Sequence, residues 1–184
     1  VQIKFDGFKT QAIKDSDGVK LYTRRGEEFT ANVSDLVKEL DSKMKPGSFI
    51  LGELVWEDAK GKQSISDVQT VVSSSPDKAK AKLEEGDGGI VFWVYDLLWD
   101  GNKDITKTNY IDRYNKLKTI VGKGSGEVKI AKNFTYSDKD KAINEALSVN
   151  AEGIVLKPKD SEYKYGAKGS NEQHGEWAKF KPDA

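Results

Sequence analysis

The sequence predicts an α+β fold, with mainly antiparallel sheets flanked by helices. Strand-like stretches follow one another through short turns near the N-terminus, and later strands are separated by single amphipathic helices. The order shows no steady strand–helix alternation, no internal repeat and no low-complexity linker. Hydrophobic residues form 36% of the chain and charged residues 33%, so we expect residues 1–184 to build one domain around a real core.

The first thirty residues predict a hairpin. Val1, Ile3 and Phe5 alternate with Gln2, Lys4 and Asp6, and the strand is expected over residues 3–13; the turn "DSDG" occupies residues 15–18, and "VKLYTR" returns as the second strand. On this alternating pattern Lys4 shares a face with Gln2 and Asp6, opposite the apolar side chains.

A helix and a strand follow the hairpin. Residues 34–44 carry an apolar stripe at helical spacing, with Ser34 as the predicted cap and "PG" at residues 46–47 as the end. The stripe consists of Leu36, Val37, Leu40 and Met44. The next stretch, "SFILGELVWE" at residues 48–57, predicts an apolar strand that carries one acid, Glu53.

The middle of the chain predicts two helices and the most apolar strand. Residues 64–75 are compatible with a helix, and residues 76–85 predict an exposed, lysine-rich helix with Pro76 in its first turn. The stretch "GGIVFWVYDLLWDG" predicts a buried strand that is interrupted by Asp96.

The last third predicts two helices and three strands. An amphipathic helix over residues 108–122 has the stripe Ile111, Tyr114, Leu117 and Val121. Residues 127–136 are strand-like, and Ser137 is the predicted cap of a helix that buries Ala142, Ile143, Ala146 and Leu147. Residues 151–159 and 176–183 predict two strands joined by a polar, glycine-bearing loop.

Composition excludes several kinds of site. The absence of cysteine excludes disulfides, thiolate nucleophiles and sulfur-ligated metals, and the single His174, expected in a surface loop, argues against a histidine metal cluster. The chain has no apolar run of membrane-spanning length and no signal-peptide pattern, so we expect an intracellular location. Thirty basic residues balance thirty acidic ones, so nucleic-acid binding would require basic groups gathered in one cleft.

Charged side chains interrupt four strands that are otherwise apolar: Lys4 with Asp6, Glu53, Glu152, and Lys179 with Lys181. Any one of them most often points to solvent, but together they supply a lysine, two acids suited to a hard divalent cation and two phosphate-binding lysines. Neighbouring cations disfavour the protonated form of a lysine, and the neutral amine is a nucleophile. The set predicts lysine attack on a metal-bound phosphoryl group, and the sequence has no P-loop.

Short motifs occur in a fixed order along the chain: "KFDGFK", "YTRRGEEFT", "ILGELVW", "VYDLLWDG", "EGIVLK" and "WAKFK". This series resembles the motifs of the covalent nucleotidyltransferases, which include ATP-dependent DNA ligases, RNA ligases and mRNA-capping guanylyltransferases. The motif "KFDGFK" is similar to the family pattern K-x-D-G-x-R. "EGIVLK" is a full match to the corresponding family motif, and "WAKFK" matches W-x-K-x-K. The stretches "YTRRGEEFT" and "VYDLLWDG" favour the adenylation domain of an ATP-dependent DNA ligase.

The resemblance implies roles for individual residues. Lys4 would attack ATP to form a lysyl-AMP phosphoramidate, with Asp6 and Gly7 in support; Tyr95 would stack on the purine and Lys157 would lie near the phosphates. The implied nucleotide-binding residues are Gln2, Ile3, Lys9, Arg24, Glu53, Tyr95, Glu152, Lys157, Lys179 and Lys181. The implied Mg²⁺ ligands are Glu53 and Glu152.

The resemblance also implies the architecture and the partners. It predicts an ATP-grasp-like nucleotidyltransferase domain with its nucleotide cleft between sheets. The expected partners are ATP and nicked double-stranded DNA. The protein is expected to be a monomer and to act at the nucleoid or at a viral replication site. Because the printed sequence ends just after the last motif, we expect a single adenylation domain that lacks the OB-fold domain of DNA ligases.

Two positions depart from the family pattern, and several alternatives stay open. Lys9 stands where arginine is usual, so its contact lacks the fixed fork of a guanidinium. Gln2 stands where glutamate is frequent in DNA ligases, and its amide can still read an adenine edge. The alternatives are an RNA ligase, a capping-type enzyme, or a domain that only binds nucleotide or nicked DNA; an NAD⁺-dependent ligase is less favoured.

Overall fold

The computed structural model describes residues 1–124, 126–165 and 178–181, and it confirms the α+β fold. The larger of its two sheets contains β2 (Phe8–Asp15), β3 (Gly18–Thr23), β4 (Ser48–Glu57), β5 (Gly89–Asp100), β6 (Lys103–Asp104) and β7 (Val128–Ile130). The smaller sheet contains β1 (Gln2–Lys4), β8 (Gly153–Leu156) and β9 (Ala178–Phe180).

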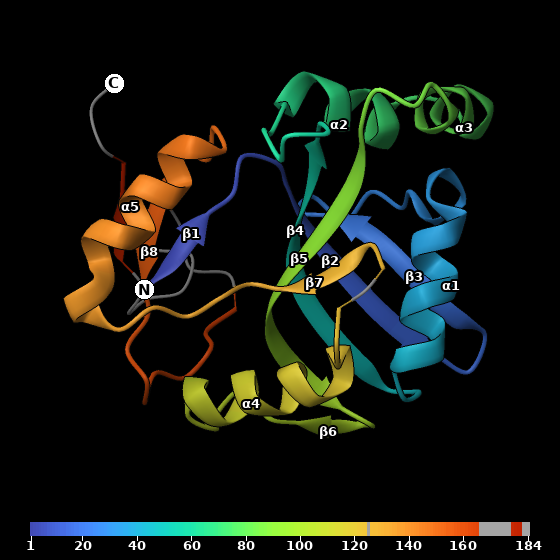
Figure 1. The fold of residues 1–184 in the computed structure, drawn as a ribbon. Helices are drawn as coiled ribbons and strands as arrows, with labels where there is room; N and C mark the ends of the chain where they lie inside the picture. Colours follow the sequence, from blue (N-terminus) through green and yellow to red (C-terminus); the bar gives the residue numbers. More distant parts are fainter. Residues whose placement is uncertain (125, 166–177, 182–184) are drawn as a thin grey trace.

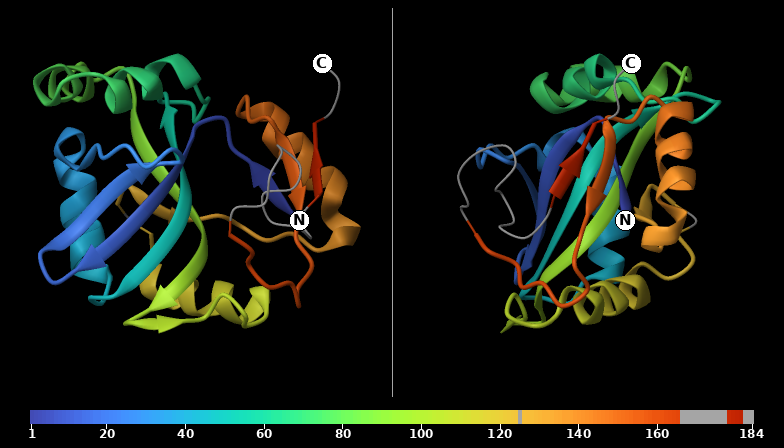
Figure 2. Two further views of the ribbon diagram at one scale, coloured as in Figure 1. Left: turned by 180° about the vertical axis from the view of Figure 1, so that it is seen from behind. Right: turned by 90° about the vertical axis from the view of Figure 1, so that its left-hand side faces the viewer.

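The pairing within both sheets is mainly antiparallel. The larger sheet has the order β3-β2-β4-β5-β6. Strand β7 also pairs with β5, and this pair is parallel. The smaller sheet has the order β1-β8-β9, so the first strand of the chain lies beside strands from its far end. Figures 1 and 2 show the two sheets next to each other, with β1 leading from the smaller sheet into the larger one.

The two sheets are covered by different helices. The helices are α1 (Ser34–Lys43), α2 (Ile65–Ser73), α3 (Pro76–Glu84), α4 (Tyr110–Val121) and α5 (Lys139–Ser148). α1 packs on β3, α2 on β4 and α4 on β5, whereas α5 covers β1 and β8 (Figure 1). Leu40, Ile50 and Phe92 belong to the large core of the first group, and Ala142 and Ile154 belong to a separate small cluster.

The strand predicted over residues 3–13 is in fact two strands in different sheets, β1 and β2. The three residues between them cross from one sheet to the other. Phe5 is buried and its ring stacks on that of Trp93 at a centroid distance of 4.8 Å. At Gly7 a side chain would collide with the carbonyl oxygen of Leu54, so only glycine fits. Strand-like residues resume at Phe8, directly after Gly7, and this short interruption is why the sequence predicted a single strand.

The predicted helices are present, but two of their caps are wrong. Ser34 is the first residue of α1 rather than its cap, and Ser137 lies in a 3-10 turn (Tyr136–Asp138) before α5. Side-chain caps occur instead at Ser64 and Ser75, whose hydroxyls accept from Asp67 N and Lys78 N at the starts of α2 and α3. Leu147 was predicted to be buried but is 52% exposed, because it lies on the solvent side of α5.

Part of the predicted C-terminal loop lies outside the described residues. This applies to His174, Gly166, Lys168 and Gly169, whereas β9 confirms a strand at the "WAKFK" motif. Among the helices of the described ranges, none has both the length and the apolar character needed to cross a membrane.

Candidate active site

A cleft of about 810 Å³ lies between the two sheets and collects residues from both. The predicted site residues that line it are Gln2, Ile3, Lys4, Gly7, Lys9, Arg24, Glu53, Tyr95, Glu152, Lys157 and Lys179. Two predicted residues are not among the lining residues. Lys181 reaches the site through Glu152, at 3.9 Å between its Nζ and Oε2, and Asp6 follows the cleft residues in the crossing segment. The cleft expected between the sheets is therefore present.

Lys4 and Glu152 meet where β1 pairs with β8. The register places Lys4 opposite Gly153, and the backbone N–H of Glu152 donates to the carbonyl oxygen of Lys4 at 2.8 Å. The side chains of Lys4 and Glu152 form an ion pair and are 20% and 33% exposed, respectively. The pairing of β1 with β8 thus sets the distance between Lys4, the candidate nucleophile, and Glu152, a candidate metal ligand.

Burial lowers the pKa of Lys4 to about 8, and the nearby cations Lys181 and Lys179 act in the same direction. The carboxylates of Glu53 and Asp6 oppose this change. A pKa near 8 leaves an appreciable fraction of the amine neutral at physiological pH, which is the form that can act as a nucleophile.

Lys179 brings a third strand to the site. It lies on β9 opposite Val155 of β8, and burial lowers its pKa, with Arg24 as the next cause. Arg24 follows β3 and is exposed at the rim of the cleft. Cations from both sheets therefore face the same space, an arrangement that suits a polyanion such as a phosphate chain.

Glu53 and Lys9 lie directly opposite each other on β4 and β2 of the larger sheet. Burial raises the pKa of Glu53 to about 8, although Lys4 and Lys9 act against it. Burial also lowers the pKa of Lys9 to about 8, and Arg24 adds to this. Lys9 Nζ donates to the hydroxyl of Tyr163 at 3.4 Å. Lys9 thus lines the cleft, but its amine cannot make the two parallel hydrogen bonds that an arginine guanidinium would provide.

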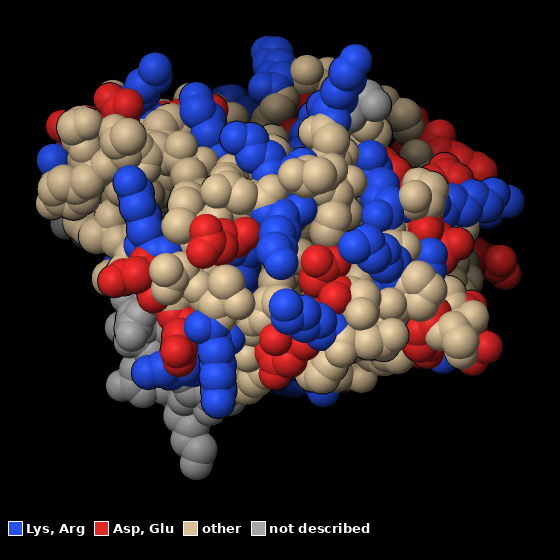
Figure 3. Space-filling model, turned by 90° about the horizontal axis from the view of Figure 1, so that it is seen from below, with Lys and Arg blue, Asp and Glu red and all other residues tan. Residues whose placement is uncertain are grey.

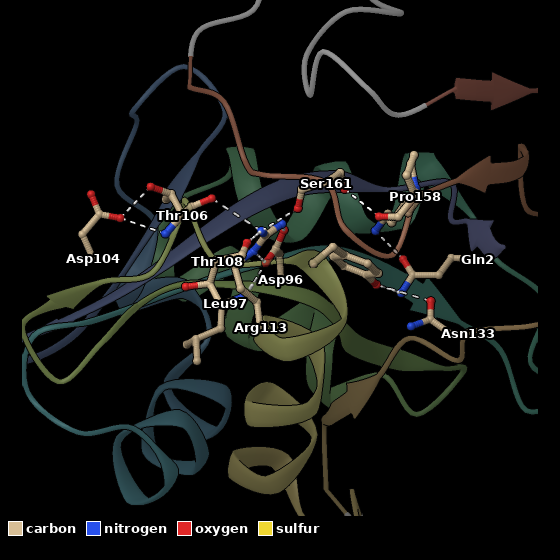
Figure 4. A network of polar contacts seen from close by, with 12 residues as sticks. Gln2, Asp96, Leu97, Asp104, Thr106, Thr108, Arg113, Asn133, Pro158 and Ser161 are labelled. Carbon is tan, nitrogen blue, oxygen red and sulfur yellow. Dashed lines mark hydrogen bonds and ion pairs between the residues drawn. The ribbon is translucent and has the colours of Figure 1, made fainter.

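The candidate purine-stacking residue, Tyr95, has Lys157 beside its ring. Lys157 Nζ lies 4.2 Å from the ring centroid of Tyr95 and 5.4 Å from that of Tyr110, and it donates to Oε1 of Gln2. Gln2 is buried, and its Nε2 donates to the hydroxyl of Tyr110 at 2.7 Å, which in turn donates to Asn133 (Figure 4). The structure therefore groups Lys157 with Gln2 and Tyr95 in one network.

Behind this network lies a buried ion pair that the sequence analysis did not select. Arg113 Nε and Nη2 donate to the two carboxylate oxygens of Asp96 at 2.8 and 3.0 Å, and both side chains are fully buried (Figure 4). Arg113 Nη1 also donates to the carbonyl oxygens of Thr108 and Ser161. The missed signal is an arginine on the apolar stripe of α4, which continues through Tyr110, Leu117 and Val121 and was predicted without it.

Other cleft residues were also missed. Those inside the quoted motifs are Phe5, Phe8, Thr23, Arg25, Glu27 and Val155, and those outside every motif are Gln69, Val72, Ser73 and Ala131. Gln69, Val72 and Ser73 come from the side of α2 that reaches the cleft. Their spacing in sequence resembles that of any amphipathic helix, so no local pattern distinguishes them.

The donor set in the cleft suits a magnesium ion. Glu53 and Glu152 are carboxylates, the ligand type that Mg²⁺ takes together with substrate phosphates. Burial disfavours the charged form of Glu53, and a nearby cation would favour it. The described residues contain no group of three or more His, Cys, Asp or Glu side chains that could hold a metal ion.

Charge on the surface is less organised than charge in the cleft. Figure 3 shows basic and acidic side chains interspersed over the face that carries α4 and β6. The cations of the cleft, by contrast, come from five separate segments of the chain: Lys4, Lys9, Arg24, Arg25, Lys157 and Lys179. This agrees with the expectation that a neutral chain must gather its basic groups in one place.

Comparison with known proteins points in one direction. The model of a family described as "ATP dependent DNA ligase domain" matches residues 1–181. A DNA ligase of Pyrobaculum arsenaticum is 30% identical over 186 residues, which cover 99% of this chain and 30% of that ligase. A DNA ligase of Natronomonas pharaonis is 26% identical over 186 residues, covering 100% of this chain and 32% of the ligase. The chain thus spans about 30% of the length of these relatives.

The solved structures show the same fold. A mycobacterial DNA ligase D complexed with ATP and MES superposes with a TM-score of 0.64 at 24% identity. The match covers 90% of this chain and 50% of the mycobacterial chain.

Proposed function

Since the chain belongs to the family of ATP-dependent DNA ligase domains, we propose that it transfers AMP from ATP to its own Lys4 and then to DNA. The observation that carries the proposal is the position of Lys4. Its amine lies in the cleft between the sheets, beside Glu152 and near two further lysines, Lys179 and Lys181. Lys9, the other lysine of the first motif, lies in the larger sheet opposite Glu53, and its Nζ donates to the hydroxyl of Tyr163.

In the first step the neutral amine of Lys4 attacks the α-phosphorus of ATP. A P–N bond forms, the bond from the α-phosphorus to the bridging oxygen breaks, and pyrophosphate leaves; the amine loses a proton to solvent. Lys179, Lys181 and Arg24 stabilise the charge on the phosphates, and this electrostatic stabilisation is the chief contribution of the site. The lysyl-AMP phosphoramidate is the product.

Glu53 and Glu152 are the residues that would hold Mg²⁺. The ion would supply charge neutralisation for the phosphate oxygens. Glu152 has a second task that the geometry supports, because its ion pair with Lys4 orients the amine within the cleft.

We assign the base end of the cleft to Tyr95 and Gln2; Lys157, which the resemblance places near the phosphates, contacts both of these side chains. Tyr95 offers a ring face for stacking, and stacking of a base on an aromatic side chain contributes about 1–3 kcal/mol. The amide of Gln2 is oriented by Tyr110 and Lys157, so it presents a fixed polar edge to a base. On this assignment the phosphates extend toward Lys9, Arg24 and Lys179.

In the later steps AMP passes from Lys4 to the 5′-phosphate at a nick, and the 3′-hydroxyl then displaces AMP to join the strands. These steps rest on the family membership, and the same holds for nicked DNA as the acceptor.

The first test is the intact mass of the protein after incubation with ATP and Mg²⁺. We expect a covalent AMP adduct in the wild type, none in Lys4→Ala, and wild-type labelling in the control Lys80→Ala on the exposed face of α3. GTP in place of ATP should give no adduct, which separates a ligase from a capping-type enzyme. An adduct that persists in Lys4→Ala would refute Lys4 as the nucleophile, and reversible nucleotide binding without any adduct would favour a pure binding domain.

The second test concerns the acceptor. The protein isolated as its AMP adduct is mixed with a nicked DNA duplex or with the corresponding nicked RNA, without further ATP. We expect AMP on the 5′-phosphate of the DNA strand first. Faster transfer to RNA would instead favour the RNA ligase alternative.

A further inference from the structure

Gln63 is a buried polar residue that no motif contains, yet it contacts both halves of the candidate active site. It lies in the turn that follows β4 and is 6% exposed. Its backbone bridges Glu57 across this turn, and the backbone N–H of the next residue, Ser64, donates to the carbonyl oxygen of Trp56 at 3.1 Å. The turn therefore holds Gln63 rigidly relative to the larger sheet.

The side chain of Gln63 holds the segment that follows Lys4. Its Oε1 accepts a hydrogen bond from the backbone N–H of Asp6 at 3.0 Å. Asp6 is the middle residue of the crossing between the sheets, where Phe5 stacks on Trp93 and Gly7 lies against Leu54. This hydrogen bond to the side-chain amide of Gln63 fixes the position of Asp6, two residues after the candidate nucleophile Lys4, where the chain has left β1.

The backbone of Gln63 holds the segment that precedes Glu152. Its N–H donates to the carbonyl oxygen of Val149 at 2.9 Å, just after the end of α5. Three residues later the N–H of Glu152 donates to the carbonyl oxygen of Lys4 at 2.8 Å. Gln63 is thus hydrogen-bonded both to the segment that contains Lys4 and to the segment that contains Glu152, and these two segments are hydrogen-bonded to each other.

We propose that Gln63 is a positioning residue for adenylation, which joins the Lys4 strand and the Glu152 strand to the larger sheet so that the amine and the carboxylate meet in the cleft. This inference deepens the proposed function and rests on it for its kinetic test. The physical basis is orientation, since a displacement of about 1 Å in a reacting group can lower a rate about 10²-fold.

The experiment compares two substitutions that each remove one side-chain acceptor from a backbone N–H. Gln63→Met removes the acceptor of Asp6 N at 3.0 Å, and Ser48→Ala removes the acceptor of Gly101 N at 3.1 Å, outside the cleft. Single-turnover adenylation is measured at several ATP concentrations, at a temperature where both variants are folded. We expect Gln63→Met to react about 10–100-fold more slowly with KM for ATP changed less than about threefold, and Ser48→Ala to react within about twofold of wild type.

A conservative variant distinguishes positioning from simple loss of stability. Gln63→Glu keeps an acceptor for Asp6 N, so it should adenylate within about threefold of wild type. If Gln63→Met does not fold, Gln63→Asn replaces it, because the shorter amide withdraws the acceptor and should show the same separation of rate from KM. A wild-type rate in the Met or Asn variant, a loss confined to KM, or an equal loss in Gln63→Glu would overturn the proposal.

A readout that needs no adenylation separates this inference from the proposed function. If the wild type forms no AMP adduct, the proposed function fails, and Gln63 is tested through hydrogen exchange of the backbone N–H of Glu152, which donates to Lys4. Looser pairing of β1 with β8 should speed this exchange about tenfold in Gln63→Met and leave it unchanged in Ser48→Ala. An unchanged exchange rate of this N–H in Gln63→Met would then overturn the inference.

Discussion

Two ion pairs in this chain use the same chemistry in different surroundings. Asp96 and Arg113 lie behind the cleft, both fully buried, and the guanidinium also donates to backbone carbonyl oxygens of two loops. Lys4 and Glu152 lie in the cleft and are 20% and 33% exposed, and Glu152 has Lys181 as a second cation.

The difference shows what separates a structural pair from a reactive one. Around Arg113 the donors and acceptors match, so neither charge has another partner to prefer. Around Lys4 the neighbouring lysines oppose its protonation, and burial acts in the same direction. A fully satisfied pair stabilises one arrangement, whereas a pair under competition can exchange its partner for a substrate. Each prediction below tests this contrast.

The largest expected effect is a loss in the free energy of unfolding when the buried Asp96–Arg113 pair is broken. Arg113→Met leaves Asp96 buried without its cation, and removal of one partner from a buried pair typically costs about 3–5 kcal/mol. Urea denaturation should show this decrease in the free energy of unfolding, whereas Lys116→Met on the exposed side of α4 should change it by less than about 0.5 kcal/mol. A loss below about 1 kcal/mol for Arg113→Met would contradict the structural role.

The next effect is on activity, at the reactive pair. Glu152→Gln keeps the shape of the side chain but removes the charge that faces Lys4 and Lys181, so adenylation should fall about 10²–10³-fold. Because the pair is partly exposed, the free energy of unfolding should change by less than about 1 kcal/mol. Single-turnover labelling and urea denaturation of the same samples check both values, with Glu162→Gln as an exposed control. A stability loss as large as that of Arg113→Met would remove the distinction between the pairs.

The third effect is on pH dependence. Only the neutral amine of Lys4 attacks, so the second-order rate of adenylation should rise about tenfold per pH unit and level off above about pH 8, near the lowered pKa of Lys4. Lys181→Gln removes a cation that lowers this pKa, so the midpoint should move to higher pH. A profile that is flat from pH 6 to 9, or a midpoint that moves down in Lys181→Gln, would contradict this explanation.

The smallest effect concerns Glu127, a half-buried acid near two other carboxylates. Burial raises the pKa of Glu127 to about 7, and the carboxylates of Asp35 and Glu39 add to this; its Oε1 lacks a hydrogen-bond partner among the described residues. Because the folded state prefers the protonated acid, its contribution to stability is greatest below about pH 4.5 and is lost as pH rises through about 7.

Glu127→Gln should therefore raise the free energy of unfolding at pH 8 by about 1 kcal/mol and change it little at pH 4.5. Thermal or urea unfolding at the two pH values measures this, and the exposed Glu145→Gln on α5 serves as the control. A destabilised Glu127→Gln at pH 8 would indicate that the carboxylate has a favourable partner after all.

Much of the fold could be predicted because its patterns are local. The stripe of α4 and the apolar run of β5 depend on residues a few positions apart, and both elements are present at the expected places. The caps were less predictable, since Ser34 and Ser64 look alike in sequence and only the second makes the capping hydrogen bond. Side-chain hydrogen bonding at a helix start depends on how the preceding chain enters, which neighbouring residues in sequence do not report.

The candidate site shows the same division. The order of motifs predicted that Lys4, Glu53 and Glu152 belong to one site, and the cleft contains all three. Arg113 was predicted only as part of an amphipathic helix, and Gln63 belongs to none of the quoted motifs. Their partners, Asp96 and Asp6, lie 17 and 57 residues away in the chain.

The sequence by itself determined most of the elements, the family that the motifs resemble and the side chains that are candidates for the chemistry, because periodicity and motif order are written along the chain. Only the tertiary structure decided that the first strand is divided between two sheets, that Gln63 contacts Asp6 and that Arg113 pairs with Asp96. The reason is physical: these contacts depend on hydrogen bonds and burial between segments that are distant in sequence, and such contacts exist only after both sheets have assembled.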